Sequence, residues 1–98
     1  MSPLQRLPVR RAEVRLFDEE LRSYLVLPDR GTTHELNSTA RAVWELCDGT
    51  TTIEELVDAI RQVFTVDREV ALSDVAAVLE QLEAARLVGW ADERGEKG

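Results

Sequence analysis

Residues 35–57 read ELNSTARAVWELCDGTTTIEELV, and this stretch decides the fold of the chain. Within it, Ala40, Val43, Trp44 and Cys47 follow one another at the spacing i, i+3, i+4, i+7. This spacing places four apolar side chains on one face of a helix. Asn37 precedes them, and its side-chain oxygen is suited to accept a free N–H of the first helical turn. The stretch therefore predicts a helix that begins after Asn37 and buries one face.

Two further helices are predicted after the first. Asp48-Gly49 ends the first helix, because Gly readily adopts the left-handed conformation of a C-cap. Thr52 and Glu55 have the spacing of a capping box and start the second helix. Residues 65–67 (TVD) interrupt the pattern, and a third helix is expected over residues 69–86. The apolar stripes are Ile53, Leu56, Val57, Ile60 and Phe64 in the second helix, and Val75, Val78, Leu79 and Leu82 in the third.

Three short strands are expected before the helices, over residues 13–17, 21–27 and 32–36. In residues 21–27, one face carries Leu21, Ser23, Leu25 and Leu27 and the other carries Arg22, Tyr24 and Val26. This is the period of a strand with enough apolar character to pack on one side. Residues 18–20 (DEE) are expected to connect the first two strands, and residues 28–31 (PDRG) have the composition of a turn. The order of three strands and three helices indicates an α+β fold that is winged-helix-like.

Length and composition indicate one small domain. The chain has 98 residues, of which 44% are hydrophobic and 32% charged, and its net charge is −7. These values are typical of a soluble globular protein. We expect residues 1–8 to be a flexible N-terminal segment, residues 9–90 the domain, and residues 91–98 a disordered polar tail. A cytoplasmic location is expected, because the sequence has no apolar stretch long enough for a membrane span and no signal-peptide block.

The residue inventory argues against an enzyme. The chain has one His, one Cys and five Gly, and none of the Gly lies in a phosphate-binding motif. His34 is expected to be a packed strand residue, and Cys47 to be a small core residue. No catalytic residue, cofactor or metal site is therefore predicted.

A DNA-binding role is disfavoured by the third helix, which would be the recognition helix of a winged helix-turn-helix. From residue 69 to residue 85 it carries four acidic side chains and no Lys or Arg. Such a helix repels phosphate groups. A sheet edge can instead bind an extended peptide as an added strand. A winged-helix transcriptional regulator and a protein-interaction adaptor remain as alternatives.

Beyond these patterns, the chain resembles the PqqD family of small peptide chaperones, also described as RiPP precursor recognition elements. The resemblance rests on residues 35–57, on the strands VRLFDEE and YLVL before them, and on DVAAVLEQLEAARLV (residues 74–88) after them. It covers about residues 12–88. It implies three antiparallel strands followed by three helices, which matches the order derived above.

The resemblance also implies a function without catalysis. Proteins of this kind bind the leader segment of a ribosomally made precursor peptide and present it to a modifying enzyme, commonly a radical-SAM enzyme. The leader is added beside the third strand and lies against the third helix. Carried onto this chain, this arrangement implies a strand edge of Thr32, Thr33, His34, Glu35 and Leu36, and a helix shoulder of Ala71, Asp74, Val75, Val78 and Leu82.

Two features depart from the family pattern. The third strand is unusually polar, and Ala85-Arg86-Leu87 stands where family members often have a Gly after the third helix. The family serves pyrroloquinoline quinone, lasso-peptide and radical-SAM peptide pathways, and the strand pattern leans towards the quinone type. The expected partners are a leader peptide and a modifying enzyme, with neither nucleic acid nor membrane. The chain is expected to be a monomer or a segment-swapped dimer.

Overall fold

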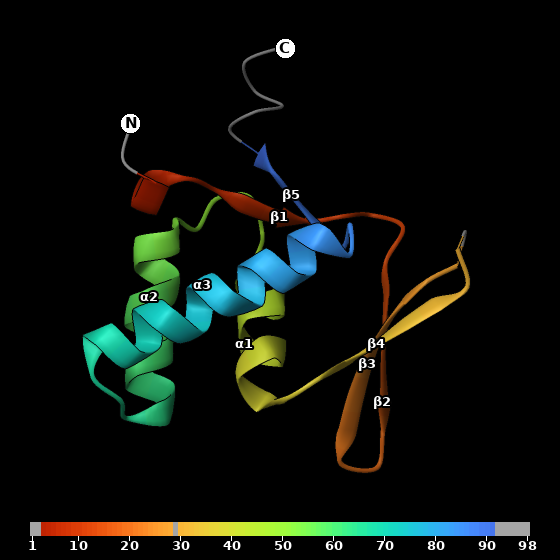
Figure 1. Ribbon diagram of the computed structural model, residues 1–98, viewed down its shortest axis with the longest axis horizontal. Coiled ribbons are helices and arrows are strands. Elements are labelled where there is room, and N and C mark those ends of the chain that lie inside the picture. The colour runs from red at the N-terminus through yellow and green to blue at the C-terminus, as the bar shows by residue number, and fades with distance from the viewer. Residues whose placement is uncertain (1–2, 29, 92–98) are drawn as a thin grey trace.

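The computed structural model describes residues 3–28 and 30–91, and it has the order of strands and helices that the sequence predicts. Three antiparallel strands precede three helices, so the predicted α+β fold is confirmed (Figure 1). The 3-10 helix η1 and two short strands at the two ends of the chain add to this plan. The elements are η1 (Pro3–Gln5), β1 (Pro8–Arg10), β2 (Arg15–Glu19), β3 (Arg22–Leu27), β4 (Thr32–Leu36), α1 (Ser38–Leu46), α2 (Ile53–Phe64), α3 (Arg68–Ala84) and β5 (Val88–Trp90).

The larger sheet has the strand order β2-β3-β4. Leu25 of β3 lies opposite Leu16 of β2 and opposite His34 of β4, so these three side chains share a face. Leu25 is completely buried, which identifies this face as the one packed on the core. The other face is more open. Strand β4 pairs with β3 on one side, and within the described residues no strand pairs with its other side.

The connection between β2 and β3 differs from the prediction. Residues 18–20 were expected to form it, but β2 continues through Glu19 and the loop consists of Glu20 and Leu21. Glu20 has a φ of 57°, which a two-residue hairpin loop requires at this position. Asp18 stays in the strand because its carboxylate accepts hydrogen bonds from Ser23 and Arg41.

The predicted N-caps of α1 and α2 are confirmed, whereas the C-cap of α1 is Cys47 and not Gly49. The side chain of Asn37 accepts a hydrogen bond of 2.8 Å from the backbone N–H of Ala40. Thr52 and Glu55 form the predicted capping box at the start of α2. Asp67 occupies the N-cap position of α3, but its side chain makes no capping hydrogen bond. Helix α3 ends at Ala84, two residues before the predicted end.

The N-terminal segment packs against the domain through β1. Pro8 is fully buried, and β1 pairs antiparallel with β5, with Val9 opposite Gly89. On its other side, β1 lies beside the loop after α1, where the N–H of Gly49 donates to the carbonyl of Pro8. Part of the segment expected to be flexible, residues 3–8, is therefore held in place in the structure. Of the expected tail, residues 92–98 lie outside the described residues.

The core lies where α3 crosses α1 and α2 and where the inner face of the sheet meets the helices (Figure 1). All the predicted stripe residues of α3 are buried, and those of α1 and α2 are buried except Ile53 and Phe64, which are half-buried. No helix within residues 3–28 and 30–91 has both the length and the apolar character needed to cross a membrane.

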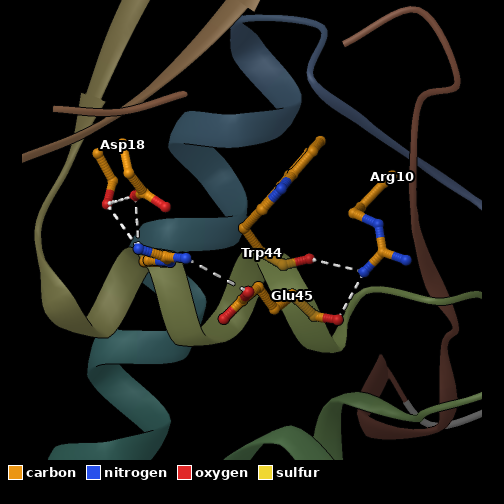
Figure 2. A network of polar contacts seen from close by, with 6 residues as sticks. Arg10, Asp18, Trp44 and Glu45 are labelled. Atoms are coloured by element: carbon orange, nitrogen blue, oxygen red, sulfur yellow. Dashed lines mark hydrogen bonds and ion pairs between the residues drawn. The ribbon is translucent and has the colours of Figure 1, made fainter. Parts of the chain in front are cut away.

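The side chains of two arginines fix helix α1 to the strands through polar contacts (Figure 2). Arg41 forms an ion pair with Asp18 of β2 and donates a hydrogen bond to Ser23 of β3. At the other end of the helix, Arg10 of β1 donates hydrogen bonds to the carbonyls of Trp44 and Glu45. These contacts hold the hairpin and its edge strand β4 in a defined position relative to the helices.

Candidate functional site

The open edge of β4 faces the C-terminal end of α3 across a pocket of about 360 Å³. We call this hollow the β4 pocket. One wall is formed by the start of β4 and by Arg30 in the turn before it, and the other by the turn that ends α3. The lining residues are Leu25, Arg30, Thr32, Thr33, His34, Ala84, Ala85, Arg86 and Leu87.

The turn that ends α3 shapes one wall of this pocket. The N–H of Leu87 donates to the carbonyl of Leu82 at 2.8 Å, and the N–H of Arg86 donates to that of Glu83 at 3.0 Å. These two bonds form a Schellman motif, which normally has Gly at the position of Arg86. Arg86 has a φ of 62° and so adopts the left-handed conformation without being Gly. The terminus thus keeps the geometry of a Gly-ended helix, although Arg86 stands at the position that Gly usually takes.

The five strand residues singled out from the sequence lie in three different places in the structure. Thr32, Thr33 and His34 line the β4 pocket. Glu35 lies outside the pocket on the outer face of the sheet, where it forms an ion pair of 3.8 Å with Arg22. Leu36 is 6% exposed and belongs to the core.

The five residues of the expected helix shoulder lie elsewhere than the pocket wall. Ala71, Val75 and Leu82 are at most 1% exposed, and Val78 is 9% exposed, so these four side chains pack in the core. Asp74 is exposed but does not line the β4 pocket. The helix meets the edge strand with its last turn and not with its middle.

Six of the pocket residues were not singled out from the sequence as site residues. Leu25 lies in β3, Arg30 precedes β4, and Ala84, Ala85, Arg86 and Leu87 end or follow α3. The sequence held one signal for this wall of the pocket, because Ala85-Arg86-Leu87 stands where a Gly was expected after the third helix. Spacing within the helix could not show which turn of α3 reaches β4, because that depends on how the helix crosses α1 and α2.

The pocket has a positive electrostatic character. Arg30 and Arg86 line it, and the described lining residues include neither Asp nor Glu. The side chains of Arg30 and Arg86 are exposed and have no hydrogen-bond or ion-pair partner within the described part of the chain. The chain as a whole carries a net charge of −7, so this is a local reversal of sign.

The groups with catalytic chemistry are not arranged for catalysis. Burial raises the pKa of the Cys47 thiol to about 12, which keeps it protonated and unreactive at neutral pH. Its Sγ donates a hydrogen bond to the carbonyl of Val43 within α1. Among the described residues, no three side chains of His, Cys, Asp or Glu lie close enough together to hold a metal ion. What the pocket offers is an unpaired strand edge, threonine hydroxyls and two guanidinium groups.

Two solved structures resemble the chain. One is TbiB1 in complex with the TbiA(β) leader peptide; it is 25% identical, has a TM-score of 0.71, and the match covers 82% of this chain and 93% of that chain. The other is the NMR structure of the PqqD truncation of PqqCD from Methylobacterium extorquens; it is 26% identical, has a TM-score of 0.69, and the match covers 84% and 87% of the two chains. The second is described as a functional, stand-alone RiPP recognition element, which is a binding and not a catalytic role.

The sequence itself gives the family. No curated protein is similar enough to be counted as a relative. Residues 13–88, however, match the family described as coenzyme PQQ synthesis protein D, and this range contains all three strands of the larger sheet and all three helices. The family assignment and the two structural neighbours agree with the resemblance found in the sequence. The chain belongs to the PqqD family.

Proposed function

We propose that this protein is a non-catalytic recognition domain that binds the leader segment of a ribosomally made precursor peptide. The leader adds itself as a strand beside β4 and is presented to a modifying enzyme of the radical-SAM type. The single observation that carries the proposal is the open edge of β4, which faces the end of α3 across the β4 pocket. The likeness to TbiB1, which was solved with a leader peptide, supports it.

Strand addition fits the chemistry of this edge. The backbone of an edge strand carries unpaired N–H and C=O groups that can bond to another extended chain. Thr32 and Thr33 are exposed, and because their side chains are short, the backbone of β4 stays accessible to a peptide. Along the same edge, the half-buried His34 gives a partly apolar contact beside Leu25.

The expected affinity is moderate. A bound leader of about ten residues must order its backbone, and each ordered residue costs roughly 1–2 kcal/mol. Much of the contact energy is offset in this way, so a Kd in the range of about 0.1–10 μM is expected. An affinity of this order allows the leader to be released to the next enzyme.

Presentation to a modifying enzyme requires that the bound leader remains accessible. The β4 pocket is an open hollow at the surface, so residues of the peptide on either side of the bound strand can extend into solvent. The radical-SAM class of the partner enzyme is proposed from the family assignment. It is tested by finding whether a radical-SAM enzyme is encoded near this protein and, if so, whether that enzyme modifies the precursor faster when the protein is added.

A pair of proline variants tests strand addition directly. In an antiparallel ladder, neighbouring residues point their N–H groups alternately towards the partner strand and away from it. Of the N–H groups of Thr33 and His34, one therefore points to β3 and the other to the open edge of β4. Proline at the first position removes a hydrogen bond to β3, whereas proline at the second removes only a donor that a bound peptide would use. The variant that keeps the melting temperature of the parent should lose binding of the encoded leader peptide, measured by calorimetry, by at least about tenfold, the effect of about 1.4 kcal/mol.

The control replaces an edge side chain without touching the backbone. Thr33→Val keeps the N–H and should bind within about threefold of the parent, because the main chain provides the affinity. If the folded proline variant binds the leader as tightly as the parent does, the peptide is bound elsewhere and strand addition at β4 is wrong.

A further inference from the structure

Arg86 lies at the boundary between two hollows. It lines the β4 pocket and also a larger pocket of about 880 Å³ between β1, β5 and the end of α3. We call the larger one the arginine pocket. Its charged and aromatic lining residues are Arg10, Arg11, Glu13, Glu83, Arg86 and Trp90. Because both hollows share Arg86, a peptide long enough to occupy both would pass this residue.

The backbone of Arg86 has a conformation that a residue with a Cβ atom adopts only at a cost. A φ of 62° is unfavourable for any residue with a Cβ atom, and Gly is the usual solution in a Schellman motif. Residues held in such conformations are concentrated at functional sites. The exposed side chain of Arg86 makes no contact that stabilises the fold through a hydrogen bond or an ion pair with the described residues.

The other arginines of the arginine pocket are already satisfied. Arg10 donates to the carbonyls of α1. Arg11 forms an ion pair of 3.2 Å with Glu13. Hydrogen bonds from its own backbone N–H and from Arg11 lower the pKa of Glu13, so this carboxyl is ionised at neutral pH and neutralises Arg11.

Glu83 accepts a hydrogen bond of 2.9 Å from the indole N–H of Trp90 and forms no ion pair with Arg86. Arg86 is thus the cation of this pocket that is left without a partner among the described residues. A guanidinium group with free donors matches a carboxylate in shape and charge.

We propose that the peptide bound beside β4 carries an Asp or Glu side chain that binds to Arg86, the residue shared by the β4 pocket and the arginine pocket. The protein therefore selects acidic leader segments, with the carboxylate at a fixed distance from the residues that form the added strand. This inference rests on the proposed function and names the class of peptide that the same site takes.

A displayed peptide library tests the selection whatever the sequence of the natural leader. Random peptides of about 15 residues are long enough, at roughly 3.3 Å per residue, to span both hollows. The library is selected against the parent protein, Arg86→Gln and Arg15→Gln. Arg15 is the matched control, because it is an exposed arginine of β2 that lines neither pocket and has no partner in the described part of the chain. We expect Asp or Glu to be enriched at one position with the parent and with Arg15→Gln, but not with Arg86→Gln.

Affinities of one selected peptide and of its Asp→Asn or Glu→Gln analogue complete the test. The analogue should bind the parent about fivefold more weakly, the effect of an ion pair at an exposed site, and should bind Arg86→Gln like the acidic peptide does. The difference should shrink at about 0.5 M salt, where exposed charges are screened. Arg86→Gly, which suits the backbone conformation, should reproduce the loss of selectivity in a protein that is at least as stable as the parent.

The results separate the two proposals. Peptides that compete for the β4 edge, lose binding in the folded proline variant and show no preference for acidic residues would overturn the inference and leave the proposed function intact. Failure to enrich any peptide on the parent protein would overturn the proposed function, and the inference with it.

Discussion

The Nη1 atom of Arg10 lies 3.3 Å from the carbonyl oxygen of Trp44, a residue 34 positions further along the chain. The same atom donates to the carbonyl of Glu45, so one guanidinium group from β1 satisfies two carbonyls in the last turn of α1 (Figure 2). Carbonyls at a helix C-terminus have no partner within the helix, and a cation there also interacts favourably with the helix dipole. Arg10 thereby links strand β1 to the C-terminal end of helix α1.

This relationship predicts the effect of Arg10→Met, which keeps much of the apolar stem but removes the donors. We expect the free energy of unfolding to fall by about 1–2 kcal/mol, as for the loss of charge-assisted hydrogen bonds. The melting temperature should fall by roughly 5–10 °C in a domain of this size, measured by circular dichroism. Arg15→Met is the control and should change the melting temperature little. Equal melting temperatures for the two variants would contradict the role assigned to Arg10.

The hairpin loop between β2 and β3 predicts a substitution that raises the free energy of unfolding. Glu20 has a φ of 57° and is exposed, so its side chain adds strain without compensating burial. Glu20→Gly should raise the free energy of unfolding by about 0.5–1 kcal/mol, since Gly adopts this conformation freely. Glu20→Ala keeps the Cβ atom and serves as the control. If urea unfolding shows Gly to be no more stabilising than Ala, strain at Glu20 does not limit stability.

The buried thiol of Cys47 predicts a loss of stability at high pH. Burial raises its pKa to about 12 in the folded protein, whereas the ordinary value is 9.0. Between these pH values the unfolded chain loses the thiol proton and the folded protein keeps it, so stability falls as pH rises. The slope contributed by this group is at most about 1.4 kcal/mol per pH unit.

The measurement is urea unfolding between pH 8 and pH 10.5 for the parent and for Cys47→Ala. The Ala variant is less stable throughout, because it leaves a small cavity, but its stability should depend less on pH. Parallel curves for the two proteins would show that Cys47 ionises as readily in the folded protein as in the unfolded chain.

The two shoulder residues Val78 and Asp74 make a fourth comparison of stability. Val78 is 9% exposed in the core, and a carboxylate in its place would be buried without a partner. Val78→Asp should lower the free energy of unfolding by about 3 kcal/mol or more. Charge reversal at the exposed Asp74 should change it by at most about 0.5 kcal/mol. A Val78→Asp protein that unfolds like the parent would show that α3 is less deeply packed than described.

The features that the sequence predicted are mainly local ones. The caps at Asn37 and Thr52 and the stripes of the three helices depend on residues three or four positions apart, and the structure confirms them. The buried face predicted for residues 21–27 follows from the period of a strand, and the burial of Ser23, Leu25 and Leu27 in β3 confirms it as well.

The features that the sequence did not show depend on long-range contacts. Strands β1 and β5 have three residues each and lie at opposite ends of the chain, so neither has a readable pattern without the other. The first hairpin loop was misplaced because the polar residues Asp18 and Glu19 resemble a turn, whereas the ion pair of Asp18 with Arg41 of α1 keeps this part in the strand. The wall opposite β4 was expected along the middle of α3, but the helix crossing brings its last turn to the strand instead.

The central claim is that a leader peptide binds between the edge of β4 and the end of α3. It is tested most directly by a ¹H–¹⁵N NMR titration of the protein with the leader of the small precursor peptide encoded nearest to it. We expect the amide shifts to concentrate in residues 30–34 and 84–87, with the backbone of Thr33 and Arg86 among the most affected. Shifts confined to α2 or to the outer face of the β2–β4 sheet, or no shifts at peptide concentrations of about 1 mM, would contradict it.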